Sequence, residues 1–310
     1  MAEKETLIVI TGPTCSGKTS CALELGRIFP VEVISADSMQ VYRYMDIATA
    51  KPTPEERRAV PHRLVDVVNP DEEFNAARFV RMAMRALEDI RSRGKIPMVV
   101  GGTGLYVKAL VHGLLEAPGC SPPLRLALKQ VARKRGLSFL REMLERLDPV
   151  CAARILPNDE IRLVRYLEIV LSTGRRPSEL MHLHRSSPAL FDAKVACIVP
   201  ERERLYNSIS ARTGVMFDRG LVEETKRLLS MGYDPSLRTM QTLAYKHVVS
   251  YVAGSIGLDE CRFLVERDTK RFAKRQLTWI RSQEGNVCLP DASEAFDTVA
   301  RWIAEERVSP

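Results

Sequence analysis

The eight residues Gly12–Thr19 restrict the fold of this chain more than any other stretch of its sequence. They fit a pattern in which a glycine is followed, after four residues, by Gly-Lys-Thr. The apolar and mostly β-branched run Leu7–Ile10 precedes the loop, and apolar residues at roughly helical spacing follow it. A strand, a glycine-rich loop and a helix in this order form a phosphate-binding loop. The sequence therefore predicts an α/β fold in which this loop joins a buried parallel strand to a helix.

The residue types of the loop suit the binding of phosphate groups. Its glycines let the backbone turn N–H groups inward, and the following helix N-terminus adds partial positive charge. Lys18 supplies a point charge, and the Thr19 hydroxyl is a ligand for Mg²⁺. A nucleoside triphosphate is the default ligand of such a loop, but any diphosphate also fits it, so the loop alone does not identify its ligand. The expected phosphate-binding residues are Gly12, Pro13, Thr14, Cys15, Ser16, Gly17, Lys18 and Thr19.

Two further strands are expected to end beside this loop. The run Val31–Ser35 leads to Asp37, and Ile96–Val100 leads to the glycine-rich turn Gly101–Tyr106. Ligands of open α/β sheets bind beyond the carboxyl ends of the strands. Asp37 is therefore either a carboxylate that faces the phosphates, as metal partner or general base, or a turn residue that caps the next segment. The glycines of the turn let the backbone approach a ligand closely, or they form an ordinary tight turn.

Composition narrows the class of protein. The chain has 310 residues, and Lys plus Arg outnumber Asp plus Glu by 46 to 39, an excess that points weakly to a polyanionic partner. The seven cysteines form no C-x-x-C pair, which argues against a disulfide framework or a thiolate zinc site and favours a cytoplasmic location. No apolar run approaches the roughly 18 residues of a membrane-spanning helix, so we expect no membrane association.

An ordered set of motifs runs along almost the full length of the chain. The motifs lie within 12–19, 37–42, 49–52, 61–66, 101–106, 158–168, 241–246 and 274–281. With these motifs in this order, the chain is similar to the tRNA dimethylallyltransferases, also called tRNA isopentenyltransferases. It departs from the family pattern at Cys15, where a smaller residue is usual, and at Ala244, where glycine is usual. We expect little effect from Cys15, a loop position; at Ala244 a close approach of RNA or backbone is in doubt.

The resemblance implies a reaction and roles for these residues. The loop would hold the diphosphate of dimethylallyl diphosphate, with Mg²⁺ on Thr19 and with Arg212 as a further clamp. The acceptor would be the exocyclic amine of the adenosine 3′-adjacent to the tRNA anticodon. Asp37 would take the proton of that amine, Thr103 would position the pair, and Lys18 would stabilise the departing charge. The fold implied is a P-loop NTPase-like parallel sheet core with an inserted all-helical domain.

The insertion and the C-terminal helices are the expected tRNA-binding parts. Residues 119–190 show helical periodicity and no good strand, so we expect a helical domain inserted into a core of residues 1–118 and 191–310. The segment Arg262–Arg281 is dense in basic residues with interleaved aromatics, as in a helix that contacts an RNA backbone, although a solvated face has the same pattern. We expect a monomer that binds the anticodon stem-loop. The resemblance assigns tRNA contact to Asp37, Ser38, Met39, Gln40, Thr103, Arg125, Ile161, Arg162, Leu163, Val164, Arg165, Gln241, Tyr245, Lys246, Lys274, Arg275, Gln276, Thr278, Trp279 and Arg281.

Two other classes of function stay open at this point. One is a P-loop enzyme with a small acceptor, either a kinase or a transferase that prenylates free adenine nucleotides. The helical insertion and the basic helix argue against it, because a small acceptor needs neither. The other is an RNA-binding protein without catalytic activity, which the pairing of Asp37 with Lys18 disfavours.

Overall fold

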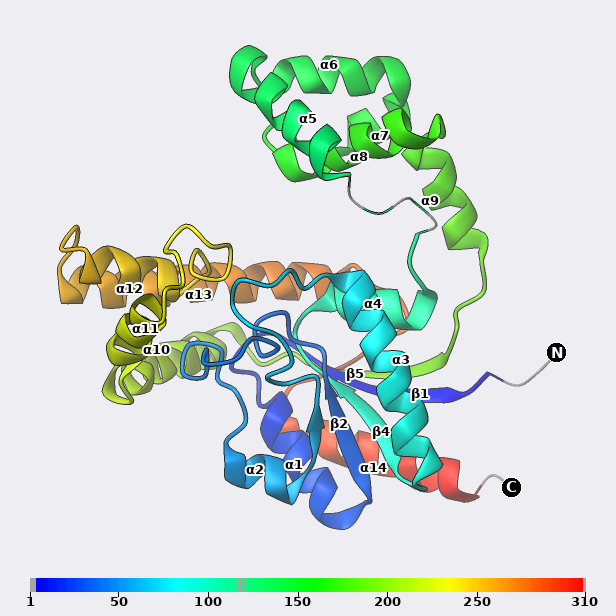
Figure 1. The fold of residues 1–310 in the computed structure, drawn as a ribbon. Coiled ribbons are helices and arrows are strands. Elements are labelled where there is room, and N and C mark those ends of the chain that lie inside the picture. Colours follow the sequence, from blue (N-terminus) through cyan, green and yellow to red (C-terminus); the bar gives the residue numbers. More distant parts are fainter. Residues whose placement is uncertain (1–3, 116, 118, 120, 309–310) are drawn as a thin grey trace. The chain divides into compact units, whose positions relative to one another are not determined.

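The computed structural model describes residues 4–115, 117, 119 and 121–308 (Figure 1). The chain separates into two compact units. The first consists of Met1–Val111 and Leu190–Pro310, and the second of His112–Ala189. Each unit is described below by itself.

Within the described residues, six parallel strands of the first unit form one sheet in the order β3-β2-β4-β1-β5-β6. The expected parallel α/β core is therefore confirmed. β1 ends where the phosphate-binding loop begins, and β2 and β4 end beside it at the same edge. The strands are β1 (Thr6–Thr11), β2 (Val31–Ser35), β3 (His62–Arg63), β4 (Ile96–Val100), β5 (Asp192–Ile198) and β6 (Val287–Leu289).

The strand β3 is only two residues long. Leu64 and Asp66 have φ angles of 64° and 57°. These values lie in the left-handed region, so the chain cannot continue as an extended strand there. The Asp66 carboxylate pairs with Lys51 and Arg57 at 2.6 and 2.7 Å. It therefore joins its loop to the segment 51–57, and it is not among the residues that line the phosphate-binding pocket.

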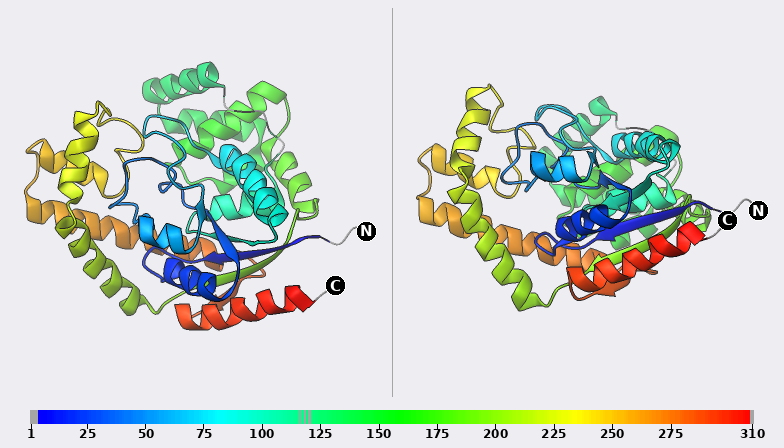
Figure 2. Two further views of the ribbon diagram at one scale, coloured as in Figure 1. Left: turned by 60° about the horizontal axis from the view of Figure 1, so that its bottom comes forward. Right: turned by 90° about the horizontal axis from the view of Figure 1, so that it is seen from below.

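Helices cover both faces of the sheet. On one face α1 (Lys18–Ile28) and α14 (Ala292–Val308) lie side by side, as two views agree (Figure 2). Their buried side chains, such as Leu25 and Val299, pack against Ile8 and Ile10 of β1. On the other face, α3 (Ala76–Ser92) packs against β2 and β4, and α4 (Gly104–His112) follows β4 directly.

Side-chain caps and a glycine set several helix ends. Thr53 and Glu56 form a reciprocal capping box at α2 (Pro54–Ala59). The Asn75 side chain accepts a hydrogen bond from the Arg78 amide at the start of α3. Gly174, in the left-handed conformation, ends α8 (Glu160–Thr173).

Buried carboxylates join the C-terminal helices to each other. The elements are α10 (Arg202–Asp218), α11 (Leu221–Ser230), α12 (Tyr245–Val252) and α13 (Leu258–Arg281). Glu224 of α11 accepts hydrogen bonds from the amides of Asp46 and Ile47 and from the Tyr245 hydroxyl. The Asp268 carboxylate of α13 contacts the Lys246 ammonium and the His247 ring nitrogen Nε2 of α12. These contacts fix the helices that form one wall of the pocket described below.

The second unit is helical throughout its described residues. It contains α5 (Pro122–Arg135), α6 (Leu137–Leu147), α7 (Pro149–Arg154), α8 and α9 (Pro177–Ser186). Leu128, Leu140, Leu144, Leu163 and Leu167 form its core with their neighbours. Cys120, one of the seven cysteines, lies outside the described residues; the six described cysteines are free thiols. No helix in the described part of the chain combines the length and the apolar character needed to cross a bilayer.

Candidate active site

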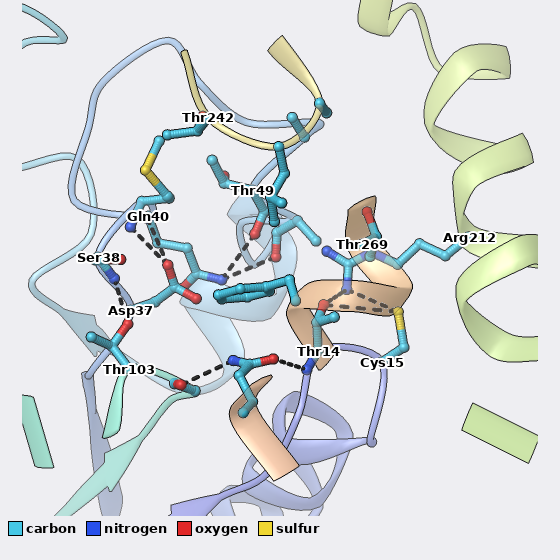
Figure 3. A pocket seen from close by; sticks show the side chains of 18 of the residues that line it. Thr14, Cys15, Asp37, Ser38, Gln40, Thr49, Thr103, Arg212, Thr242 and Thr269 are labelled. Atoms are coloured by element: carbon cyan, nitrogen blue, oxygen red, sulfur yellow. Dashed lines mark hydrogen bonds between the residues drawn. The ribbon is translucent and has the colours of Figure 1, made fainter. Parts of the chain in front are cut away.

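The carboxyl edge of the sheet borders a pocket of about 680 Å³ (Figure 3). The phosphate-binding loop, the segment after β2, the turn after β4, and helices α10 and α13 all contribute side chains. The pocket therefore unites the motifs that the sequence spreads over more than two hundred positions. Its charged lining is mainly cationic. The acidic lining residue is Asp37, and the basic ones are Lys18, Arg212, Arg238, Lys246 and Arg275.

The phosphate-binding loop has the expected strand and helix on either side. Gly12 and Gly17 have φ angles of 156° and 93°, and a Cβ at Gly12 would lie 2.5 Å from the Ile198 carbonyl oxygen. The Lys18 ammonium donates to the Pro13 carbonyl at 2.5 Å and to the Ser16 hydroxyl at 3.4 Å. Burial lowers the pKa of Lys18 to about 8, and the nearby Asp37 charge opposes this shift. The lysine is therefore cationic at neutral pH and close enough to Asp37 to feel its charge.

Asp37 uses its two carboxylate oxygens differently. Oδ1 accepts from the amides of Met39 at 2.8 Å and Gln40 at 3.3 Å, which is the turn-capping role. Oδ2 accepts no hydrogen bond from any residue that the structure describes, and the side chain lines the pocket. The turn-capping role of Asp37 is thus present in one oxygen, and the other oxygen accepts no hydrogen bond from a described residue.

Thr103 holds the Asp37 turn from the neighbouring strand. Its hydroxyl oxygen accepts from the Ser38 amide at 3.0 Å, and its own amide donates to the Ala36 carbonyl at 3.1 Å. These bonds connect the ends of β2 and β4 directly beside the carboxylate. Thr103 is therefore placed to fix the orientation of Asp37.

The glycines of the turn after β4 serve close packing within the protein. A Cβ at Gly101 would overlap the backbone of Ala36, and one at Gly104 would overlap the Trp279 ring. A Cβ at Gly102 would overlap the Gln276 amide. We expected these glycines to let a ligand approach the backbone closely. In the structure, atoms of the protein itself occupy the space that the missing Cβ atoms leave.

Arg212 reaches the phosphate-binding loop from α10. Its Nη1 donates to the Thr14 hydroxyl at 3.1 Å and to the Cys15 sulfur at 3.4 Å (Figure 3). Spacing along the sequence gives no indication of this contact. Cys15 was expected to act only as a loop backbone position. Its thiol instead takes part in the site, and its φ of 62° places it in the left-handed region.

The oxygen donors of the pocket suit a magnesium ion. The Thr19 hydroxyl makes no hydrogen bond to a described residue, and Thr19 lines the pocket together with Asp37. Mg²⁺ is commonly held by one or two protein oxygens, with phosphate oxygens and water completing its shell. The described residues contain no group of three or more His, Cys, Asp or Glu side chains that could form an all-protein metal site. The donor set fits a metal that binds with a phosphate ligand.

The candidate tRNA contacts of the helical unit divide into exposed and buried side chains. Ile161 and Arg162 are exposed on α8. Leu163 and Val164, at 0% and 3% exposure, belong to the core of this unit, so direct contact of their side chains with RNA is excluded. Arg125 and Arg165 pair at 2.8 and 2.9 Å with the buried Glu168, which orients both guanidinium groups.

The candidate contacts of the C-terminal helices divide in the same way. The Tyr245 side chain is buried and donates to Glu224, so it supports the fold and cannot contact RNA. Lys246 pairs with Asp268 at 2.7 Å. Gln276 and Trp279 face the protein, where they meet Gly102 and Gly104. The exposed candidates are Gln241, Lys274, Arg275, Thr278 and Arg281.

Sequence reasoning missed several residues that shape the pocket. Arg238 lines it and makes no hydrogen bond to a described residue, and Phe272 of α13 contributes an apolar wall. Lys51, with a side chain only 2% exposed, bonds the Tyr42 carbonyl, Asp46 and Asp66 and thereby fixes the loop that carries Thr49. Lys51 lies within the motif 49–52, but its role could not be read from that motif, because its partners are brought together only by the fold.

Comparison with known proteins finds matching family models and similar relatives. A family model described as IPP transferase matches residues 40–283, and one described as isopentenyl transferase matches residues 5–66. A protein of Geobacter sulfurreducens named tRNA dimethylallyltransferase is 48% identical over 278 residues, covering 90% of this chain and 89% of its own. One of the same name from Thermotoga maritima is 41% identical over 303 residues, covering 96% of this chain and 98% of its own.

Solved structures give the same result. A tRNA isopentenylpyrophosphate transferase from Bacillus halodurans superposes with a TM-score of 0.71 at 35% identity, covering 97% of this chain and 96% of that chain. A eukaryotic dimethylallyltransferase, solved acting on tRNA, superposes with a TM-score of 0.81 at 30% identity, covering 97% of this chain and 77% of that chain.

Proposed function

The chain belongs to the IPP transferase family, and from this premise we propose that it prenylates tRNA. It transfers the dimethylallyl group of dimethylallyl diphosphate to the N6 amine of the adenosine 3′-adjacent to the anticodon and releases diphosphate. The observation that carries this proposal is the single pocket in which the phosphate-binding loop and the Asp37 carboxylate meet. Relatives that match about nine-tenths of this chain are named for action on tRNA, so the small-acceptor alternatives explain the chain less well.

Charge on the diphosphate is stabilised at one side of the pocket. Lys18, the inward N–H groups of the loop and Arg212 act on the phosphate oxygens, because each is a cation or an N–H donor at the loop. The Lys18 ammonium, which bonds Pro13 and Ser16, exchanges these partners for phosphate oxygens. As the carbon–oxygen bond to the diphosphate breaks, these groups stabilise the leaving group.

The acceptor amine is activated at the other side. As the carbon–nitrogen bond forms, the N6 nitrogen loses a proton, and the available Oδ2 of Asp37 accepts it. Oδ1 stays bonded to the turn, so the carboxylate keeps its orientation during the transfer. Thr103 holds this turn through Ser38 and so acts as a positioning residue.

We also propose Mg²⁺ as the metal of this reaction. Thr19 and phosphate oxygens would hold it, and when bound it neutralises part of the diphosphate charge.

The target base has to leave the stack of the anticodon loop to reach Asp37. Loop bases unstack more readily than duplex bases, at a cost of a few kcal/mol. Exposed or pocket-lining cations of the first unit, such as Arg275 and Arg238, would attract the loop phosphates. We propose that residues 119–190 form a second tRNA-binding domain, in which Arg125, Ile161, Arg162 and Arg165 are the available contacts. We further propose that the protein acts in the cytoplasm as a monomer, where its free thiols stay reduced.

An acceptor comparison tests the proposal. The protein is incubated with radiolabelled dimethylallyl diphosphate, Mg²⁺ and either unmodified tRNA or AMP. We expect label in the tRNA alone. Label in AMP but not in tRNA would reject tRNA as the acceptor. A parallel incubation also contains ATP, and consumption of this ATP without any prenyl transfer would instead favour a kinase.

A further inference from the structure

One side chain of α13 joins the two halves of the active site. The Gln276 Oε1 accepts from the Thr14 amide of the phosphate-binding loop at 2.9 Å, and its Nε2 donates to the Gly102 carbonyl at 2.9 Å. Both bonds have good length for N–H···O contacts. They bridge 262 and 174 positions of sequence, so no local structure requires them.

The protein is built to accept this bridge. Gly102 has no Cβ, and a Cβ there would occupy the position of the Gln276 amide. Trp279, one helical turn further along α13, lies in the same way over Gly104. Two residues on one face of α13 thus lock onto two glycines on either side of Thr103. A shift of α13 would therefore also move the glycine-rich turn that follows β4.

The bridge continues to the catalytic carboxylate. Gly102 precedes Thr103, whose hydroxyl oxygen accepts from the Ser38 amide next to Asp37. At the other end of the bridge, the Thr14 hydroxyl oxygen accepts a hydrogen bond from Arg212. Gln276 therefore fixes the spacing between the diphosphate groups and the Asp37 turn, although its amide carries no charge and its two functional groups are both used within the protein.

The cations next to Gln276 on α13 belong to the surface expected to meet RNA. Lys274 and Arg275 directly precede Gln276 and are exposed, and Arg275 also lines the pocket. An RNA backbone bound to these cations restrains α13, and Gln276 carries that restraint to the phosphate-binding loop. Binding that orders one shared element gives a reciprocal coupling free energy between two ligands.

From this arrangement we propose that Gln276 is a positioning residue that couples tRNA binding on α13 to diphosphate binding in the loop. The inference rests on the proposed function, since it takes tRNA as the ligand of the basic face. It differs from a contact role for Gln276, because the amide is bonded to Thr14 and Gly102 and does not face RNA. Each ligand then strengthens the binding of the other.

The test measures this coupling without the chemical step. The dissociation constant of a fluorescent anticodon stem-loop RNA is measured with and without saturating inorganic pyrophosphate and Mg²⁺. We expect pyrophosphate to tighten RNA binding of the wild-type protein about fivefold or more, the usual lower range of coupling between sites. We call the ratio of the RNA dissociation constants without and with pyrophosphate the coupling factor. In Gln276→Met, which keeps the length of the side chain but removes both hydrogen bonds, this factor should fall to near one. The RNA dissociation constant without pyrophosphate should change less than about twofold.

Two further variants decide between coupling and a merely structural role. Gln276→Glu can still accept from Thr14 but cannot donate to Gly102, so we expect a reduced factor; it also gives the answer if the Met variant does not fold. Gln283→Met makes the same change at a glutamine whose side chain, among the described residues, bonds Trp279 and Ser282 alone, and it should behave as wild type.

Three outcomes would overturn the inference. They are a wild-type factor of one, an unchanged factor in the Gln276 variants, and a loss of binding of each ligand alone with the factor preserved. None of these affects the proposed function, which fails only if the wild-type protein transfers no prenyl group to tRNA.

Discussion

Replacement of Asp37 by asparagine separates its two roles. The asparagine amide keeps an oxygen that can accept from the Met39 and Gln40 amides, but it has no carboxylate to take a proton. A positioned general base contributes about 10²–10⁴-fold, or about 3–5 kcal/mol of activation free energy. We therefore expect Asp37→Asn to lower the single-turnover rate by about that factor. Its melting temperature should stay within a few degrees of wild type, since the turn is retained.

Asp37→Ala removes the turn acceptor as well. It leaves two amides without their partner, and we expect an additional loss of about 1–2 kcal/mol in the free energy of unfolding. Asp66→Asn is the matched control, because that carboxylate pairs with Lys51 and Arg57 away from the pocket. It should lower stability while the transfer rate stays near wild type.

The assay combines three measurements. Transfer from radiolabelled dimethylallyl diphosphate to tRNA is followed in a single turnover, RNA affinity is measured by filter binding, and unfolding is measured by calorimetry. The reasoning is refuted if Asp37→Asn keeps more than about a tenth of the wild-type rate. It is also refuted if the main effect of this variant is a loss of RNA binding, which would make Asp37 a structural residue.

Four other expectations follow from the same contacts. Because the pKa of Lys18 is lowered to about 8, the lysine loses its charge above that pH. Binding of dimethylallyl diphosphate at pH 8.5 should therefore take up a proton, which calorimetry detects as a difference between the binding heats in two buffers. Equal binding heats in the two buffers, or proton uptake that persists in Lys18→Met, would contradict this. Hydrogen bonding from Arg93, followed by Lys95 and Arg63, lowers the pKa of Glu32 to about 2 against the effect of burial. Its contribution of about 3 kcal/mol to the free energy of unfolding is therefore complete above pH 4.5 and lost as the pH falls towards 2. Glu32→Gln should weaken the pH dependence of unfolding between these values, and an unchanged dependence would refute the role. Gly101→Ala should destabilise the chain by several kcal/mol in denaturant unfolding, since its Cβ would overlap the Ala36 backbone, and a variant as stable as wild type would show that the turn can move. RNA affinity should fall steeply between about 50 and 200 mM salt; a flat response in filter binding would remove the basic helix face from the account.

The sequence predicted the parts of the fold that depend on local patterns. The phosphate-binding loop, the parallel strands around it and the caps at Asn75 and Thr53 each follow from residues close together in the chain, and the structure has them. The ordered motifs also identified the family. These signals are short-range or are carried by a fixed order of motifs, which is why they can be read without coordinates.

The sequence could not predict which side chains turn inward. Leu163, Val164 and Tyr245 lie in motifs expected to bind RNA, yet they are buried, because a helix presents alternate sides to core and solvent. The contact of Arg212 with Thr14 spans 198 positions, and that of Gln276 with the same residue spans 262. Such contacts arise only when α10 and α13 are placed against the loop, so residue spacing carries no trace of them.

The most direct measurement is an experimental structure of the protein with tRNA and an unreactive thio analogue of dimethylallyl diphosphate. The account predicts the diphosphate on the loop that carries Lys18 and Thr19. It also predicts that an Asp37 oxygen lies about 2.6–3.2 Å from the N6 amine of the adenosine next to the anticodon. An adenosine that stays stacked in the anticodon loop, or one whose amine contacts a group other than Asp37, would contradict it.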